Sequence, residues 1–482
     1  MIKTRLLILA LAVVLTGGCT LGPDYMRPET DLPLTEEGGS DENYELFTQV
    51  RWWDAFNDPE LNKLIEEALL NNRNLVTALA RVEEASGRAG VAFADRLPQL
   101  GAAGSGSRQQ VTRDQAMSGA GAGRIQTSWQ ANAIFSFELD LWGKYRRLDE
   151  AAQAEFLASE ASRDTVQLTL SADVANAYFL LRSLQAQCLI ASNMLDTYDE
   201  TCAIFTRRLE AGLIQEIDLR RMEAERDANA ATLHLLKNSL SQAETMLAVL
   251  VGKSPRNIIE YKFSDSLALE DLQPPPLIPE NLPSGLLARR PDIRQAEGLL
   301  IAANARIGAA RAAFFPSISL TGGGGYLSGD VDSLFNGSSA VWNFVGNLGQ
   351  PIFQGGRLIA QEAVAQAQYK QMFANYELTV QQAFKDARDA LINNQERRIV
   401  FNYRLKQVQS LERSLYLANR QYEVGTIGLM DLLDVRRNLL RGQLDLADGR
   451  QAQLSAVVLL CKSLGGGWRE DLGFREDPGD DQ

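Results

Sequence analysis

The sequence predicts a mainly helical chain built from a duplicated unit, with strands of the kind found in membrane β-barrels. Three observations support this fold class. Residues 99–254 and 352–477 contain no proline, which permits very long helices, because proline in a helix interior costs about 3 kcal/mol. Apolar and polar residues alternate with a period of two between Gln126 and Asp140. The second half of the chain also repeats features of the first half.

The chain begins with a pattern typical of an exported protein. Two basic residues precede an apolar run from Leu6 to Leu15, and small residues follow up to Cys19. An apolar run this short predicts a cleaved signal peptide, residues 1–18, rather than a membrane span. A cysteine after two glycines resembles the lipobox of bacterial lipoproteins, so we expect a lipid on Cys19 and a lipid-anchored tail over residues 19–58. An ordinary signal peptide with an incidental cysteine is the alternative.

Composition excludes several classes of protein. The formal net charge of -13 makes nucleic-acid binding a poor fit. No later segment offers the roughly twenty consecutive apolar residues that a membrane-spanning helix needs. Cys188 and Cys202 fall in one expected helix, about 21 Å apart, which is too far for a disulfide. We expect both of them, and Cys461, to be buried small hydrophobic residues.

The duplication is clearest where Glu210-Ala211-Gly212-Leu213-Ile214 recurs as Glu423-Val424-Gly425-Thr426-Ile427. The offset between matching features is roughly 213 to 218 residues. We therefore predict a first repeat over residues 59–250 and a second over 284–462, joined by a linker over 251–283 and followed by a C-terminal segment, 463–482. The first repeat has strands at about 99–112 and 126–140, a long helix at about 144–212 and a tip at 212–218. The second has strands at about 317–328 and 340–350, a long helix at about 356–424 and a tip at 425–431.

The strands predict an assembly of several chains. Between residues 126 and 140 the alternation gives one apolar and one polar face, as in a membrane barrel. In the second hairpin Trp342, Phe344 and Leu348 would share a face, although the strand register there is open. Four strands cannot close a barrel, and an open edge in lipid leaves backbone groups unpaired at several kcal/mol each. Several copies must therefore pool their strands.

These motifs resemble the outer-membrane factor family of TolC-like ducts, in its lipoprotein branch of efflux proteins. The resemblance extends over nearly the whole mature chain. It is carried by Cys19 to Tyr25, Trp53 to Leu61, Arg289 to Ile293, Ala309 to Ser317, Gln354 to Arg357 and the turn from Gly425 to Asp434. It implies a homotrimer with a twelve-stranded barrel and a long helical tube through the periplasm. It also implies that residues 251–283 are an equatorial linker and residues 463–482 a C-terminal equatorial or tail segment. It also implies three associates: a periplasmic adaptor, an inner-membrane pump and the lipid of the cell outer membrane.

The resemblance also assigns roles to residues at the inner end of the tube. The tips would contact the adaptor through Gly212, Leu213, Ile214, Gly425, Thr426 and Ile427. The periplasmic aperture would be lined by Asp431 and Asp434, with Met430 as a possible apolar plug. In the repeat alignment Asp434 corresponds to Arg221, and in a ring of alternating repeats this arginine could neutralise Asp434 and latch the closed state. Alternatively, Arg221 and Arg437 both lie on a solvated helix face.

The sequence offers no set of residues for catalysis. His234 is the only histidine, so a histidine triad or histidine-rich metal site lacks its residues. We expect no enzyme activity, no cofactor and no metal. Two other classes stay open: a structural lipoprotein that bridges membrane layers, and a lipoprotein hydrolase with a helical coat. Among ducts, efflux of small molecules such as drugs and secretion of polypeptides cannot be distinguished from this chain.

Overall fold

The computed structural model describes residues 20–28, 51–110, 112, 125–260, 268–275 and 289–466. Cys19, the predicted signal peptide and the loop joining the first two strands lie outside these residues. The chain forms two compact units. Unit 1 comprises residues 1–29, 81–160 and 295–377, and unit 2 comprises residues 30–80, 161–294 and 378–482. Each unit therefore draws on both halves of the sequence.

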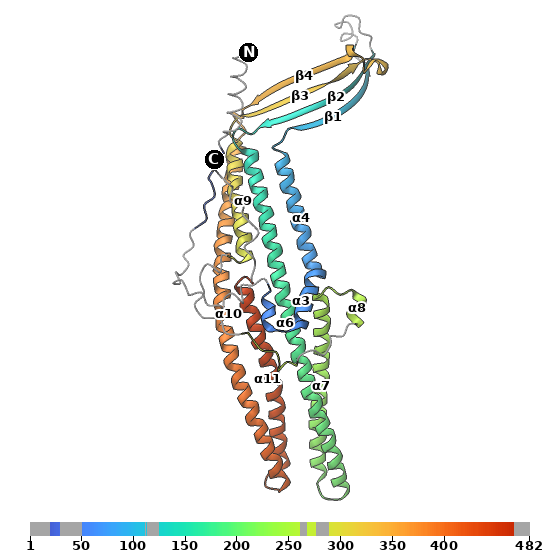
Figure 1. Cartoon of the computed structure of the whole chain (residues 1–482), viewed down its shortest axis with the longest axis vertical. Coiled ribbons are helices and arrows are strands. Elements are labelled where there is room, and N and C mark those ends of the chain that lie inside the picture. Colours follow the sequence, from blue (N-terminus) through green and yellow to red (C-terminus); the bar gives the residue numbers. More distant parts are fainter. Residues whose placement is uncertain are drawn as a thin grey trace. The chain divides into compact units, whose positions relative to one another are not determined.

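Long helices dominate the chain (Figure 1). In chain order the helices are η1 (Trp52–Phe56), α3 (Pro59–Asn71), α4 (Arg73–Ala94), α6 (Lys144–Glu210), α7 (Glu216–Leu250), α8 (Pro255–Glu260), α9 (Pro291–Ala312), η3 (Val331–Ser333), η4 (Gly337–Ser339), α10 (Arg357–Glu423) and α11 (Leu429–Ser463). Both α6 and α10 have 67 residues, which is about 100 Å of helix at 1.5 Å per residue. The part of the chain that is described contains no helix both long and apolar enough to traverse a bilayer.

Unit 1 contains a four-stranded antiparallel sheet. Its strands are β1 (Gln99–Gln110), β2 (Ile125–Leu139), β3 (Ser317–Ser328) and β4 (Ala340–Gly349), in the order β1-β2-β3-β4. The second hairpin, whose register the sequence leaves open, pairs Ser317 with Gly349 and Tyr326 with Ala340. Trp342, Phe344 and Leu348 of β4 are 84%, 64% and 71% exposed. The sheet thus presents large apolar side chains outside the packing of its own chain.

Small residues let the helices of unit 1 approach closely. Ala151 and Ala154 of α6 are buried against Ala302 and Ala305 of α9. At Gly298 an added Cβ would lie 3.0 Å from the Cβ of Ala158, so even an alanine would be tight there. This close packing fixes α9 against the first part of α6.

Unit 2 has an aromatic core. Trp52, Trp53 and Phe56 of η1 are buried together with Tyr178 and Phe179 of α6. The rings of Trp52 and Trp53 meet edge to face with centroids 5.7 Å apart, a favourable arrangement for aromatic pairs. The sequence-based boundary at residue 58 places η1 in the tail, whereas the structure packs it into this core. Burial of two tryptophans and a phenylalanine explains the difference, because removing these large apolar side chains from water stabilises the folded chain.

Asp58 connects this core to the start of α3. Its side chain is 1% exposed. One carboxylate oxygen accepts the N–H groups of Glu60 and Leu61 at 2.9 and 3.3 Å, and the other accepts the hydroxyl of Tyr178 at 2.5 Å. Pro59 follows at the first helical position, where its missing N–H has no consequence. A single carboxylate thus caps α3 and holds it to α6.

Arg290 joins the start of α9 to α10 and α11. Its guanidinium bonds Asp292 at 3.1 and 2.8 Å. It also donates to the carbonyls of Ala383 in α10 at 3.4 Å and Ser463 in α11 at 2.9 Å. The motif from Arg289 to Ile293 is therefore a structural clamp at the start of α9.

The lone histidine and the cysteines have no special arrangement among the described residues. His234 is exposed on α7. Cys202 and Cys461 are buried, as expected, but Cys188 is only half-buried, and all three are free thiols. The described residues contain no group of three or more potential metal ligands.

Candidate functional site

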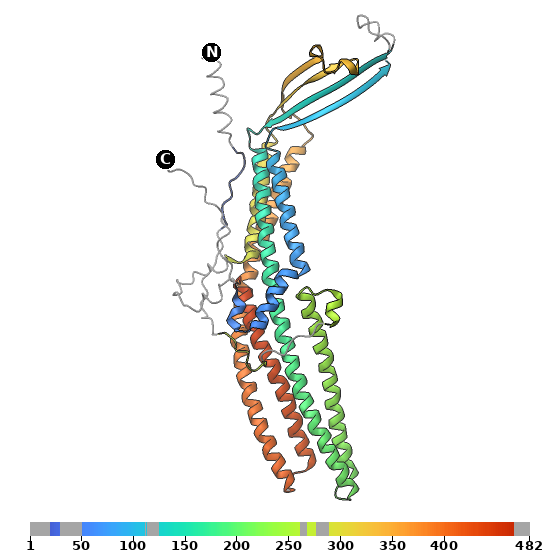
Figure 2. The same cartoon turned by 45° about the vertical axis from the view of Figure 1, so that its right-hand side comes forward.

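The loops that join α6 to α7 and α10 to α11 have the same backbone structure. Gly212 and Gly425 have positive φ values of 70° and 74°, which glycine adopts without the strain that other residues meet. Each glycine N–H donates to the carbonyl three residues earlier, and the next N–H donates to the carbonyl five residues earlier. These bonds satisfy carbonyls at the helix end in the manner of a Schellman motif. Both loops lie at the same end of unit 2 (Figure 1 and Figure 2).

The side chains at these tips divide into an exposed pair and a half-buried pair. Leu213 is 74% exposed, and Thr426, its counterpart in the second repeat, is also exposed. Ile214 and Ile427 are half-buried, and Ile214 packs against the core beneath. Of the four apolar or β-branched residues expected to face outward, only Leu213 and Thr426 therefore present most of their surface.

A separate hydrophobic cluster, here the tip cluster, lies beneath the two loops. Its members come from both repeats: Tyr198, Cys202 and Phe205 of α6, Leu219 and Met222 of α7, and Leu429 and Leu433 of α11. The cluster joins the α6–α7 hairpin to α11. Movement of one hairpin away from the other would expose these side chains to water, which opposes separation.

The residues expected at the aperture begin α11. Met430 is 44% exposed. The carboxylate of Asp431 accepts the N–H of Gly428 at 3.1 Å, so it satisfies a donor at the helix start and lies where the helix dipole favours negative charge. Asp431 therefore stabilises the turn as well as presenting a charge.

The structure does not bring Arg221 and Asp434 together within one chain. Among the described residues, Asp434 forms its ion pair with Arg437, three residues later on α11. Arg437 also reaches Glu225 of α7, with an N–O distance of 3.4 Å. Arg221 lies 4.0 Å from Asp218, on its own helix. Beside the aperture residues, the described ion pair between the two repeats is thus Arg437 with Glu225, which the repeat alignment did not suggest.

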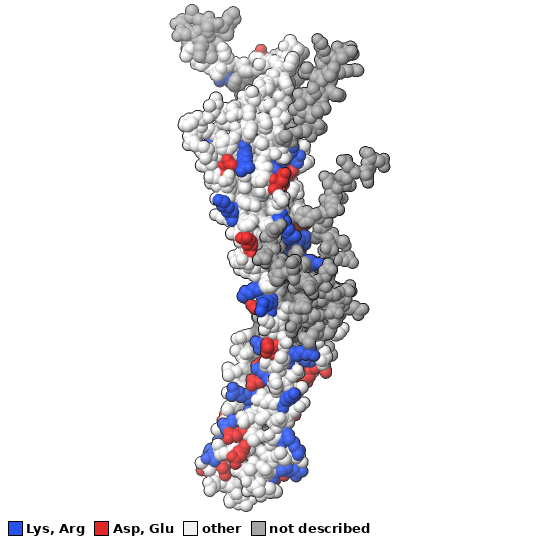
Figure 3. Space-filling view, turned by 90° about the vertical axis from the view of Figure 1, so that its left-hand side faces the viewer, with Lys and Arg blue, Asp and Glu red and all other residues white. Residues whose placement is uncertain are grey.

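Arg436 is a further charged residue near the tips that sequence reasoning missed. Burial lowers the pKa of its guanidinium. It lies 3.5 Å from the side-chain oxygen of Asn419, and its Nη1 atom has no hydrogen-bond acceptor among the described residues. Figure 3 shows Lys and Arg side chains close to Asp and Glu side chains on the surface toward the tips. Arg436 differs from these solvated pairs because it is partly buried.

Residues 20–28, here the N-terminal dock, lie on the helices of unit 1. The N–H of Leu21 donates to the carbonyl of Trp142 at 3.2 Å. Arg147 of α6 donates to the carbonyl of Leu21 at 3.3 Å and pairs with Asp24 at 2.7 Å. Asn304 of α9 donates to the carbonyl of Pro23 at 2.8 Å. The chain immediately after Cys19 is therefore held at the start of α6.

Two glycines make this docking possible. Gly22 has a φ of 105°, and a Cβ there would lie 2.4 Å from the Cα of Gly308 on α9. A Cβ on Gly308 would lie 2.5 Å from the carbonyl oxygen of Leu21. Backbone thus contacts backbone, and any side chain at either position would push the dock away.

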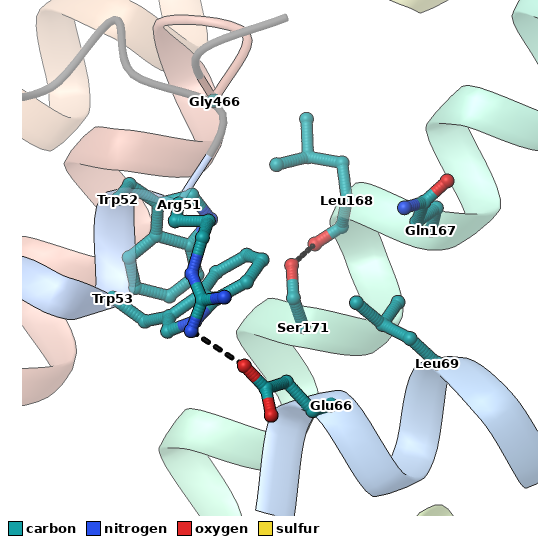
Figure 4. Close-up of a pocket in the computed structure, with 9 residues that line it drawn as sticks. All are labelled: Arg51, Trp52, Trp53, Glu66, Leu69, Gln167, Leu168, Ser171 and Gly466. Carbon is teal, nitrogen blue, oxygen red and sulfur yellow. Dashed lines mark hydrogen bonds and ion pairs between the residues drawn. The ribbon is translucent and has the colours of Figure 1, made fainter. Parts of the chain in front are cut away.

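A small pocket of about 210 Å³ opens beside η1 in unit 2 (Figure 4). Arg51, Trp53 and Glu66 lie on one side of it, and Leu69 and Leu168 line the rest with their neighbours. Its two charged side chains pair with each other at 2.5 Å. The pocket therefore offers mainly apolar surface and no free charge of its own.

Comparison with protein families gives a match over most of the chain. Residues 64–253 and 282–466 match the family described as "Outer membrane efflux protein". The probable efflux pump outer membrane protein TtgC of Pseudomonas putida is 35% identical over 475 residues, which is 97% of this chain and 96% of that protein. The cation efflux system protein CusC of Escherichia coli is 35% identical over 472 residues, 97% of this chain and 99% of that protein.

Solved structures give the same result. The CmeC outer membrane channel of Campylobacter jejuni superposes with a TM-score of 0.86 at 28% identity, over 94% of this chain and 96% of that one. The open state of the MtrE outer membrane channel of Neisseria gonorrhoeae superposes with a TM-score of 0.81 at 32% identity, over 93% of this chain and 98% of that one. The fold is therefore that of outer-membrane channels.

Proposed function

Because the chain belongs to the outer membrane efflux protein family, we propose that it is the exit duct of a tripartite efflux system, with no catalysis of its own. The membership confirms the predicted family and the predicted outer-membrane location. One combination of features carries the proposal. A four-stranded antiparallel sheet is joined to two 67-residue helices, each of which turns back at a glycine tip.

The duct would be a homotrimer. In the described sheet β1 and β4 are the outer strands, and each pairs with one strand only. Unpaired backbone groups cost several kcal/mol each in lipid, so both edges need partners from other copies. Three copies would supply the twelve strands of a closed barrel. The exposed Trp342, Phe344 and Leu348 support a lipid-facing surface on β4.

The transported molecules would be small molecules such as drugs or toxic compounds, delivered by an inner-membrane pump through a periplasmic adaptor. The similar proteins differ in the cargo that their names state, since CusC is named for cation efflux and a second TtgC of Pseudomonas putida for toluene efflux. A duct common to such different cargo selects little by itself. The pump would then determine specificity.

Planar-bilayer conductance tests the duct proposal against the two other classes. The purified full-length protein should produce discrete conductance steps after insertion into a bilayer. A structural lipoprotein or a hydrolase with a helical coat would produce none. Absence of steps from protein that inserts and migrates as a trimer would contradict the proposal.

We propose that the tips contact the adaptor. Leu213 and Thr426 are the exposed tip residues, so their replacement by cysteine should disturb folding little. In cells that express the adaptor, Leu213→Cys and Thr426→Cys should each crosslink to it through a short thiol-reactive linker. Cysteine at Leu235, which is 69% exposed on α7 away from the tips, is the matched control. Equal crosslinking from Leu235→Cys, or none from either tip, would contradict contact at the tips.

We propose that Cys19 carries the lipid and that the barrel holds the protein in the membrane independently. Each buried CH₂ of an acyl chain contributes about 0.8 kcal/mol, but a closed barrel needs no such help. The Cys19→Ser variant, exported with a signal peptide that does not depend on lipidation, should lose all acyl labelling. It should still fractionate with the outer membrane. A wholly soluble periplasmic variant would show that the sheet does not insert.

We propose that Asp431, Asp434 and Met430 line the periplasmic aperture. Three copies of a carboxylate around one axis repel by about 1 kcal/mol per pair at close range in a wet pore, so the closed state needs opposite charge. Arg437 supplies it within the chain. Arg221 of a neighbouring copy is the second candidate, because first and second repeats would alternate around a trimeric ring.

A further inference from the structure

Arg450 of α11 is a buried arginine that pairs with no carboxylate of the described residues. It is 8% exposed, and it forms no ion pair with any residue that the structure describes. Its Nη1 donates to the side-chain oxygen of Gln453 at 3.0 Å, and its Nη2 lies 3.5 Å from the carbonyl oxygen of Glu270. Its Nε has no acceptor among those residues. A buried cation in this state costs free energy unless something negative accompanies it.

Among the described residues, Arg450 contacts an aromatic ring and forms no ion pair. Its guanidinium carbon lies 5.0 Å from the centre of the Phe401 ring, which provides a weak cation–π contact. Burial lowers the pKa of its guanidinium group, and no carboxylate of the described residues offsets this shift. A buried arginine is stabilised by an acidic side chain or by a bound anion.

Room for such an anion is present as a cavity of about 350 Å³ that Arg450 lines. This volume lies within the range of small-molecule sites. One wall is α10, where Asn394, Arg398 and Asn402 recur at intervals of four residues and therefore share a helix face. The opposite wall is α11, and the linker between the repeats closes a third side through Gln273, Pro274 and Pro275.

The chemistry of this lining is one-sided. It holds two arginines and four side-chain amides, and none of its described residues is acidic. Arg398 is exposed and, like Arg450, makes no ion pair with any described residue. Guanidinium groups and amide N–H groups together are the donors that bind carboxylate, phosphate and sulfate oxygens.

We propose that this cavity binds a small oxyanion between Arg450 and Arg398. Because linker residues form one wall, the bound anion fastens the linker to α10 and α11. The site lies apart from the tips and the aperture, so it is independent of the proposed duct function. A bound anion would stabilise the position of the linker between the two repeats.

The test uses the full-length protein in a non-ionic detergent, with inorganic phosphate as the probe and sodium chloride at equal ionic strength as the control. Phosphate should raise the denaturation temperature in a saturable manner, because a ligand of the folded state stabilises it. Calorimetry should give the dissociation constant. Hydrogen exchange at residues 268–273 should slow in the same concentration range.

Three variants separate a binding site from a merely structural arginine. Arg450→Met should abolish the response to phosphate while its denaturation temperature in chloride stays unchanged or rises, since an uncompensated buried charge is removed. Because Arg398 is exposed, the Arg398→Gln variant should fold normally. Its affinity for phosphate should fall about tenfold, equivalent to about 1.4 kcal/mol. Arg441→Gln, on an exposed position of α11 outside the cavity, should respond like the natural protein.

Two results would overturn the proposal. One is an equal response of the natural protein and Arg450→Met to phosphate, which would mean non-specific salt stabilisation. The other is a large loss of stability in Arg450→Met together with no response of the natural protein. That result would mean that a carboxylate of the assembled protein already neutralises Arg450.

Discussion

Asp58→Ala is expected to destabilise the folded chain by about 3 kcal/mol. About 1 kcal/mol comes from loss of the cap on α3, whose two N–H groups the carboxylate accepts. About 2 kcal/mol more comes from loss of the buried charge-assisted bond with the Tyr178 hydroxyl. The measurement is the denaturation midpoint of the detergent-solubilised protein at fixed concentration, because oligomer stability depends on concentration.

Two companion variants divide this effect. Asp58→Asn keeps an oxygen for the cap and should retain part of the stability. Tyr178→Phe removes the hydroxyl and keeps the ring in the core, so it should cost about 2 kcal/mol, the contribution of the bond alone. If the bond is as described, Asp58→Ala combined with Tyr178→Phe should cost less than the sum of the two changes. Additive losses would mean that the two side chains stabilise the protein independently.

Arg437→Ala is expected to raise the single-channel open probability about tenfold. The bridge from Arg437 to Glu225 joins α11 to α7, and a partly exposed pair of this kind contributes about 0.5 kcal/mol. In the proposed trimer, three such pairs would contribute about 1.5 kcal/mol to the closed state, roughly a tenfold shift of the equilibrium between closed and open. The measurement is the single-channel record in planar bilayers, for each variant under the same salt and voltage.

The same recording distinguishes the partners of Asp434. If Arg437 is the partner, Asp434→Ala should add little to Arg437→Ala, whereas Arg221→Ala should have no effect. If Arg221 of a neighbouring copy latches the aperture, Arg221→Ala should open the channel and Asp434→Ala should add little to it. Arg220→Ala, which breaks pairs with Glu216 and Glu223 on its own helix, is the control. An equal effect of Arg220→Ala would show that any lost charge near the tips opens the channel.

Local patterns in the sequence predict most of the secondary structure. Absence of proline accounts for α6 and α10, and the alternation from residue 126 to 140 accounts for β2. The register of the second hairpin could not be read, because Gly322 to Gly325 give that strand four consecutive positions without side chains. A strand without alternating side chains does not mark its faces. Pairing with β2 and β4 supplies the register instead.

Contacts between distant residues were beyond the sequence. The bond between Tyr178 and Asp58 joins residues 120 positions apart, and nothing in their local context marks them. The N-terminal dock and the burial of Arg450 also depend on residues far apart in the sequence, so local patterns do not predict them. The pairing of Asp434 with Arg437 was different, since acidic and basic residues three apart on a helix are neighbours. That local signal was available, but the repeat alignment directed attention to Arg221 instead.

The N-terminal dock bears on how deeply the protein is immersed. Thr20 packs at Gly143, where a Cβ would lie 3.0 Å from the Thr20 Cα, and Gly143 lies between the end of β2 and the start of α6. The described part of the chain therefore starts, at Thr20, beside the junction between β2 and α6. If Cys19 carries the proposed lipid, its acyl chains would enter the leaflet beside the ends of the strands. The acyl group would then fix how deeply the sheet inserts, relative to the periplasmic surface of the outer membrane.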